Sequence, residues 1–157
     1  MDYTEDSRPA HRGLLRGGLL LLAANPLTGG LWALILPRSF YEDFPLPGRD
    51  WVSTLGPYNE HLIRDYGALN LALAVLLVGA AILLERHLVQ VALVTWLVFA
   101  TPHLVFHIGQ THHFSARSNV EQWGGLILVV LLPLFLLFFA VPRGSKVALG
   151  DTRRSDR

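Results

Sequence analysis

The chain has 157 residues, of which 52% are hydrophobic and 16% are charged, and its mean hydropathy is +0.40. This much apolar side chain exceeds what a soluble domain of this size carries, so the composition predicts a lipid bilayer as the solvent. The net charge of +1 leaves no basic excess for nucleic acid, and the lack of cysteine excludes disulfides and every Cys-ligated cofactor.

Four long apolar runs are expected to cross the membrane as helices. A hydrocarbon core of about 30 Å needs about 20 consecutive apolar residues, and each run meets that length. In chain order the expected spans are 14–37, 60–84, 88–109 and 120–142. With flexible tails at 1–12 and 144–157 they form a single membrane domain over residues 1–157, an all-α integral membrane four-helix bundle.

The distribution of basic residues predicts the orientation of these spans. With a cytoplasmic N-terminus, nine basic residues lie on the cytoplasmic side and four lie outside, namely Arg38, Arg49, Arg64 and Arg117. The positive-inside rule therefore favours both termini in the cytoplasm. Residues 38–65 and 107–122 then face the outside.

The first outer segment is expected to contain a short interfacial helix. Pro45 and Pro47-Gly48 turn the chain, Asp50 can cap a helix that carries Trp51, and Gly56-Pro57 can end it. We expect the aromatic side chains of this segment to lie against lipid headgroups or to fold over the mouth of the bundle. The simpler alternative is a loop that anchors the protein at the right depth.

Proline interrupts three of the spans. A proline removes the hydrogen bond of the carbonyl four residues earlier, and in hydrocarbon that carbonyl needs another partner. The residues concerned are Pro26, Pro102 and Pro133, which free the carbonyls of Leu22, Val98 and Val129. Kinked helices packed against neighbours are the expected result.

Two acidic residues have expected roles at helix starts. Ser118 to Glu121 match a capping box that would begin the fourth span. Glu60 would favour the positive N-terminal end of the second helix.

Polar residues gather at the expected outer ends of the second and third spans. His61 and Asp65 are four residues apart and project within about 40° of each other, and Arg64 extends the same stripe. His103 and His107 have the same spacing on the third span, and Gln110 continues their stripe. The predicted ligand-binding residues are His61, Arg64, Asp65, His103, His107 and Gln110.

Three interpretations of this cluster stay open. Histidines four residues apart can share one metal ion if a third ligand joins them, so a divalent metal site is predicted from His61, Asp65, His103 and His107. The second interpretation is a hydrogen-bonded network that holds the two spans together. The third is protonation, because imidazole titrates near neutral pH.

Three segments carry a family resemblance, namely Gly30-Leu31-Trp32-Ala33, the loop from Pro37 to Pro45, and residues 57–68. Its most specific parts are Phe40 to Pro45 and the Arg64-Asp65-Tyr66-Gly67 run that opens the second span. Over residues 13–142 the chain resembles small bacterial four-helix membrane proteins of the DoxX-like type. The resemblance implies a multi-pass protein of the bacterial cytoplasmic membrane. Because a few such relatives are subunits of quinone-linked oxidoreductases, it adds quinone to the ligands considered.

Two functions follow from these observations. The first is a non-enzymatic membrane protein, an accessory or interaction subunit whose His-rich outer mouth contacts a partner or a lipid-like ligand. The second is a membrane oxidoreductase component that binds a metal ion or a quinone at the His/Asp cluster. The expected partners are the lipid bilayer and either another membrane protein or a second copy. No charged residue lies in the central half of any span, which argues against an ion pump or coupled transporter.

Overall fold

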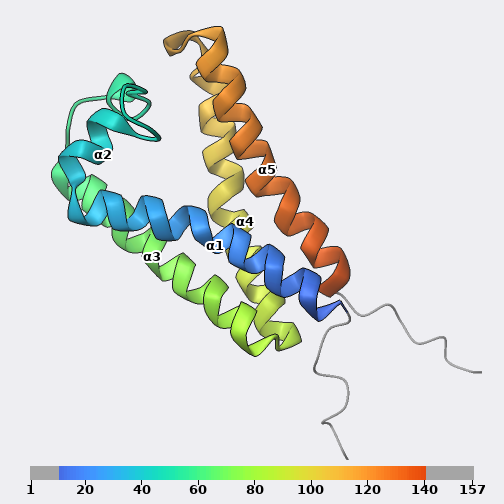
Figure 1. The fold of residues 1–157 in the computed structure, drawn as a ribbon. Coiled ribbons are helices and arrows are strands. Elements are labelled where there is room, and N and C mark those ends of the chain that lie inside the picture. Colours follow the sequence, from blue (N-terminus) through green and yellow to red (C-terminus); the bar gives the residue numbers. More distant parts are fainter. Residues whose placement is uncertain (1–10, 141–157) are drawn as a thin grey trace, which may run out of the picture.

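The computed structural model describes residues 11–140, and this part of the chain contains helices and no strand (Figure 1). Its helices are α1 (Arg12–Ile35), α2 (Pro37–Asp43), α3 (Glu60–Leu83), α4 (Arg86–Gly109) and α5 (Ala116–Ala140). Two 3-10 turns, η1 (Ser53–Leu55) and η2 (Thr111–His113), lie in the connections. Four helices, α1, α3, α4 and α5, are long and apolar enough to cross a membrane, which confirms the prediction of a multi-pass helical protein.

The second long helix, α3, starts at Glu60 as expected, whereas polar side chains at the caps shift the starts of α4 and α5. The Glu85 carboxylate accepts hydrogen bonds from the backbone N–H groups of His87 and Leu88, so α4 starts at Arg86. The prediction that a capping box at Ser118 begins the last helix was wrong. Ser115 Oγ accepts from Ser118 N at 3.2 Å instead, and α5 starts at Ala116, one turn earlier than expected.

The tails lie almost entirely outside the described residues, as does the expected end of the last span at 142. Residue 12 is an exception, because α1 begins at Arg12 where a flexible tail was expected. Apolar content alone ended the predicted span at 14, although arginine is a good helix former.

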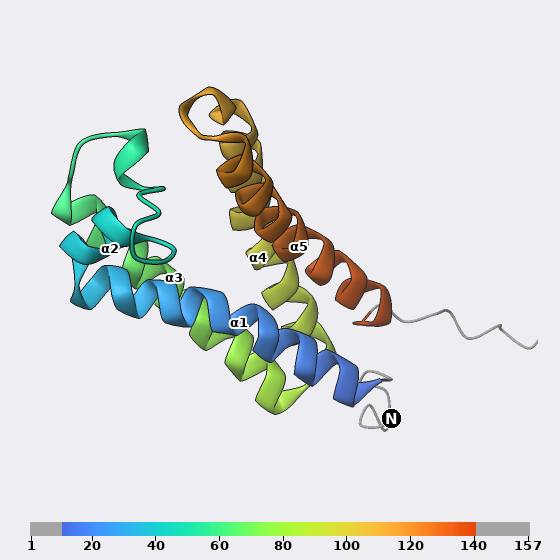
Figure 2. The same ribbon diagram turned by 45° about the horizontal axis from the view of Figure 1, so that its top comes forward.

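The long helices form two pairs, α1 with α3 and α4 with α5 (Figure 1). The pairs meet at the end where α1 begins and α5 ends, which we call the termini end. They diverge toward the opposite end, called the loop end, which holds α2, residues 44–59 and residues 110–115 (Figures 1 and 2). The molecule therefore has a closed end and an open end.

Glycine brings α1 and α3 into close contact. A Cβ atom added at Gly67 would lie 2.8 Å from the backbone nitrogen of Leu34 and 2.9 Å from the carbonyl oxygen of Gly30. No larger residue fits without separating the helices. This crossing makes the α1–α3 pair a tight unit.

Apolar side chains from all four long helices fill the termini end. The buried members include Leu19, Leu77, Leu93 and Leu136, and Trp96 lies among them with 1% of its surface exposed. Packing of this kind fixes the two pairs relative to each other where they meet.

The carbonyl freed by Pro133 finds a partner on a neighbouring helix, as expected. Trp96 Nε1 of α4 donates a hydrogen bond to the backbone oxygen of Val129 on α5, at 2.7 Å. Buried indole N–H groups need an acceptor, and the carbonyl that Pro133 leaves free supplies one. The N–H of Trp96 and the carbonyl of Val129 therefore satisfy each other.

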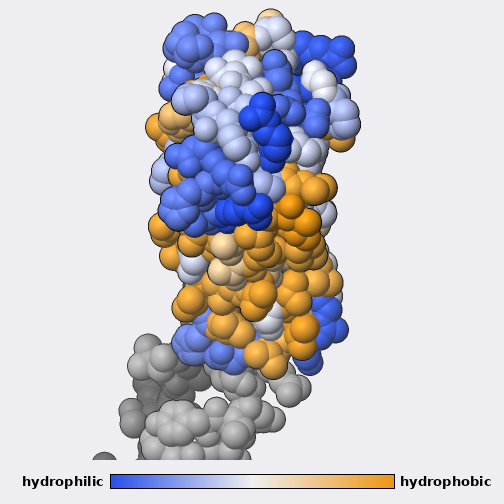
Figure 3. Space-filling view, turned by 90° about the vertical axis from the view of Figure 1, so that its left-hand side faces the viewer, coloured by the Kyte–Doolittle hydropathy of each residue, from blue (hydrophilic) through white to orange (hydrophobic). Residues whose placement is uncertain are grey.

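The surface of the helices is apolar around the middle of the molecule. Figure 3 shows a band of hydrophobic residues below a hydrophilic region. Large apolar side chains such as Leu69, Val75 and Val98 are mostly exposed within the helices. A soluble protein would not leave so much contiguous apolar surface in water, whereas lipid covers it without penalty.

The connection between α1 and α3 contains a helix in a different place from the expected one. Pro37 at the first position starts α2, because its fixed φ suits a helix start and its missing N–H is not needed there. After Trp51 there is only the short turn η1, and Asp50 contributes its backbone oxygen, 3.0 Å from Thr54 N, rather than a side-chain cap.

Candidate functional site

A cavity of about 900 Å³ lies between the two helix pairs in the half of the molecule toward the loop end. Cavities that hold small ligands reach about this size. Every long helix contributes to it, and residues 44–55 cover one side. The lining residues that matter below are Leu22, Asn25, Phe44, Trp51, Trp96, Phe99, His103, His107, Gln122, Gly125 and Leu132.

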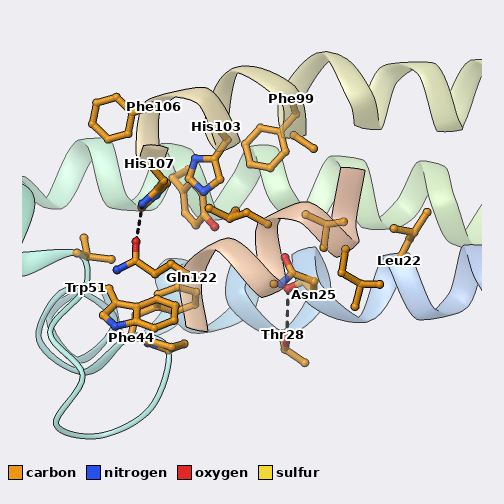
Figure 4. A pocket seen from close by; sticks show the side chains of 18 of the residues that line it. Leu22, Asn25, Thr28, Phe44, Trp51, Phe99, His103, Phe106, His107 and Gln122 are labelled. Atoms are coloured by element: carbon orange, nitrogen blue, oxygen red, sulfur yellow. Dashed lines mark hydrogen bonds between the residues drawn. The ribbon is translucent and has the colours of Figure 1, made fainter. Parts of the chain in front are cut away.

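Most of the lining is apolar, and the polar groups are concentrated toward the loop end. Trp96 and His107 both line the cavity from α4, and their separation of 11 positions corresponds to about 16 Å of helix, half of a bilayer core. Leu22, Trp96 and Leu132 line its deep part, while Asn25 on α1 adds an amide to the wall (Figure 4). The shape and polarity suit an elongated molecule with one polar end.

The cavity is not closed. Leu21, Leu62, Phe106 and Leu128 belong to its lining, and each has more than half of its surface exposed. These residues come from different helices of the two diverging pairs. A molecule dissolved in the membrane can therefore reach the cavity sideways, between the pairs.

A pair of polar side chains joins α4 to α5 at the polar end. His107 Nδ1 lies 2.8 Å from Gln122 Oε1 (Figure 4). An amide oxygen only accepts, so the imidazole donates and carries its proton on Nδ1. Gln122 is 3% exposed, and its Nε2 has no partner in the described residues. The glutamine therefore fixes both the ring orientation and the tautomer of His107.

His103 stands one turn deeper on α4 and is held by aromatic contacts. Its ring stacks on Phe99 with centroids 5.5 Å apart and meets His107 edge to face at 4.6 Å. Between residues 11 and 140 its side chain has no hydrogen-bond partner. The two imidazoles lie on one face of α4, as their spacing of four residues predicts, and both line the cavity.

The other predicted site residues lie on the exposed side of α3 and at the end of α4. His61 Nε2 is 3.3 Å from Asp65 Oδ2, with 88% of the His61 side chain exposed. Arg64 pairs with Glu60 at 2.8 Å and also donates to the backbone oxygen of Leu34. Gln110 ends α4, where its backbone N–H is bonded to the oxygen of His107. None of these side chains lines the cavity.

The predicted metal set is therefore not assembled in this structure. His61 and Asp65 form one pair and His103 and His107 another, because α3 and α4 belong to helix pairs that diverge toward the loop end. Among residues 11–140, no three His, Cys, Asp or Glu side chains are close enough to hold one metal ion. The common face expected from topology does not bring the four residues into contact.

The loop that covers the cavity is tied to α5 by an ion pair. Arg49 Nη2 lies 3.1 Å from Glu121 Oε1, and both side chains are about two-thirds buried. Arg117 also binds Glu121, at 2.9 Å, so the carboxylate is a link between the loop and the helix, not a cap. Trp51, from the same loop, also lines the cavity, and its covered Nε1 has no hydrogen-bond partner among the described residues.

Sequence reasoning missed Gln122 and the place of the loop aromatics. Gln122 follows Glu121 in a polar segment, so nothing marked it as buried. A helical projection beginning at Ala116 places residues 122, 125, 129 and 132 on one face, which is the face that lines the cavity. Phe44 and Trp51 line the cavity, which agrees with the expectation that the aromatic side chains of this loop fold over the mouth of the bundle.

No protein-family model, curated protein or solved structure matches this chain. The DoxX-like resemblance thus stays a prediction from the sequence segments that suggested it. What the fold defines is a class, the multi-pass helical membrane proteins, and the function must be argued from the cavity.

Proposed function

We propose that this protein is a non-enzymatic subunit of the bacterial cytoplasmic membrane that binds a small lipid-like molecule and presents it to a partner protein. The observation that carries the proposal is the cavity of about 900 Å³, which is apolar in its depth and polar at the loop end. In the orientation favoured by the basic residues, the polar end faces outward and the ligand stands as an outer-leaflet lipid does.

The arrangement of charges supports binding more than catalysis. Glu121, the one carboxylate among the described lining residues, is held by Arg49 and Arg117. A carboxylate held in this way is not available as a general base. The hydrogen bond from His107 Nδ1 to Gln122 fixes the orientation of the ring and leaves Nε2 to bond with a ligand.

Two neighbouring glycines allow a sharp test. Gly125 lines the cavity and Gly124 does not, and a Cβ atom at either position would meet nothing within 4 Å. Gly125→Phe is expected to fill the cavity without disturbing the helix contacts, and Gly124→Phe is the matched control that points elsewhere.

The measurement is the lipid retained per protein chain after purification in mild detergent, quantified by mass spectrometry of the extract. Wild type and Gly124→Phe should retain the same amphiphile at near one per chain, and Gly125→Phe should lose it. Equal retention by all three proteins, or none in wild type, would contradict the proposal.

The second candidate is a component of a membrane oxidoreductase that binds a quinone or a metal ion. Its support is the pair His103 and His107 in the cavity wall, since imidazoles bind both quinone oxygens and metals. Elemental analysis and an absorption spectrum of the purified protein test it. A metal or quinone at near one per chain, lost in His103→Ala/His107→Ala, would favour this candidate. Colourless, metal-free protein without quinone would exclude it.

A further inference from the structure

We propose that the cavity selects an amphiphile whose polar end is an uncharged hydroxyl group. The inference rests on the proposed lipid-binding function and names the chemistry of the ligand. It comes from the charges and the hydrogen-bonding capacity of the residues at the polar end.

The described lining of the cavity does not favour a charged headgroup. It contains no lysine or arginine, so a phosphate or carboxylate would enter without a lining cation to compensate its desolvation. A cationic headgroup would find Glu121 already paired with two arginines. A cationic headgroup that displaced them would leave Arg49, whose side chain is 29% exposed, without its carboxylate partner. The favoured headgroup is therefore neutral.

The tautomer of His107 requires that this neutral headgroup donate a hydrogen bond to the ring. Because Nδ1–H is bonded to Gln122 Oε1 at 2.8 Å, the neutral ring has its lone pair on Nε2. That nitrogen accepts a hydrogen bond from an O–H group. An ether or ester oxygen has no hydrogen to give and leaves it unpaired.

His103 extends the same requirement. Its neutral ring has one donor and one acceptor nitrogen, and neither has a partner within residues 11–140. A hydroxyl group both donates and accepts, so a single one can serve both rings, whose centroids are 4.6 Å apart. The histidine pair thus recognises a hydroxyl group by hydrogen bonding, and the apolar deep part of the cavity accommodates the hydrocarbon chain attached to it.

The test uses three probes that differ only at the head: dibromostearyl alcohol, its methyl ether, and dibromostearate at pH 8. Bromine quenches tryptophan fluorescence on contact, and Trp51 and Trp96 both line the cavity. Titration of the full-length protein in nanodiscs, with Gly125→Phe as the baseline for quenching from the bilayer, gives the binding curves. The alcohol should bind about 5- to 10-fold more tightly than the methyl ether, as one hydrogen bond predicts, and more tightly than dibromostearate.

Substitutions then test the assignment to His107. His107→Phe should reduce the preference for alcohol over ether and His103→Phe/His107→Phe should abolish it, whereas His61→Phe, on the exposed face of α3, should keep it. Gln122→Leu removes the acceptor that keeps the proton on Nδ1 and should reduce the preference. An undiminished preference in His107→Phe or in Gln122→Leu overturns the assignment.

The outcomes separate the inference from the proposed function. Equal binding of alcohol and ether above the Gly125→Phe baseline refutes hydroxyl selection and leaves lipid binding intact. Tighter binding of dibromostearate refutes the argument from charge. No quenching above the baseline by any probe refutes the lipid-binding function itself.

Discussion

The hydrogen bond between Trp96 and the carbonyl freed by Pro133 makes a quantitative prediction about the stability of the bundle. Trp96→Phe removes the donor that lies 2.7 Å from the Val129 oxygen and leaves this carbonyl without a partner in an apolar core. A buried acceptor left unpaired costs about 1–3 kcal/mol. The smaller ring adds a packing loss that does not depend on the proline.

Pro133→Ala restores the N–H that an unbroken helix would offer to Val129. In that background Trp96→Phe loses only packing, since the carbonyl keeps its helical partner. The two substitutions should therefore be coupled by about 1 kcal/mol, which lies between the average of about 0.6 kcal/mol and the maximum of about 1.7 kcal/mol measured for hydrogen bonds between membrane helices.

The assay is reversible unfolding by SDS in mixed micelles, followed by far-ultraviolet circular dichroism so that loss of a tryptophan does not change the signal. The free energy of unfolding is measured for wild type, both single variants and the double variant. Trp96→Phe combined with Pro26→Ala is the control, because Pro26 lies on α1 and frees a different carbonyl. If Trp96→Phe costs the same with and without Pro133, the proposed pairing is refuted.

Two further predictions concern the helix crossing and the loop. Gly67→Ala should reduce the free energy of unfolding in the same SDS assay by about 1–3 kcal/mol, because its Cβ would overlap backbone atoms of α1. The control is Gly79→Ala, whose Cβ would meet nothing within 4 Å and which should not destabilise the bundle. Arg49→Gln should loosen the loop and accelerate amide hydrogen exchange of residues 44–56 about five-fold, as loss of an ion pair worth about 1 kcal/mol implies. Arg117→Gln, which breaks a pair within α5, should leave that exchange unchanged.

The fold was largely predictable because one physical rule governs it. A long uncharged apolar run must become a helix when its solvent is lipid, and all four runs did. Helix ends were less predictable, because single side chains such as Ser115 and Glu85 decide them. Similar polar residues nearby, including Ser118, match the same capping pattern.

The site was predictable only in part. The spacing of His103 and His107 correctly predicted that they share a face of one helix. Whether His61 belonged with them depended on how far α3 and α4 diverge, and that angle is set by packing at the opposite end of the bundle. Periodicity along one helix carries no information about it, so Gln122 of α5 could not be named as the partner of His107.

The sideways opening between the helix pairs determines which concentration governs occupancy. For a molecule that enters from the bilayer, the relevant concentration is its mole fraction in the membrane. This mole fraction determines the share of protein chains that have the molecule bound. An amphiphile that is nearly insoluble in water can then saturate the protein while its aqueous concentration stays negligible. Affinities for this cavity belong on a scale of moles of ligand per mole of lipid, and dilution with buffer at constant lipid composition should leave the bound fraction unchanged.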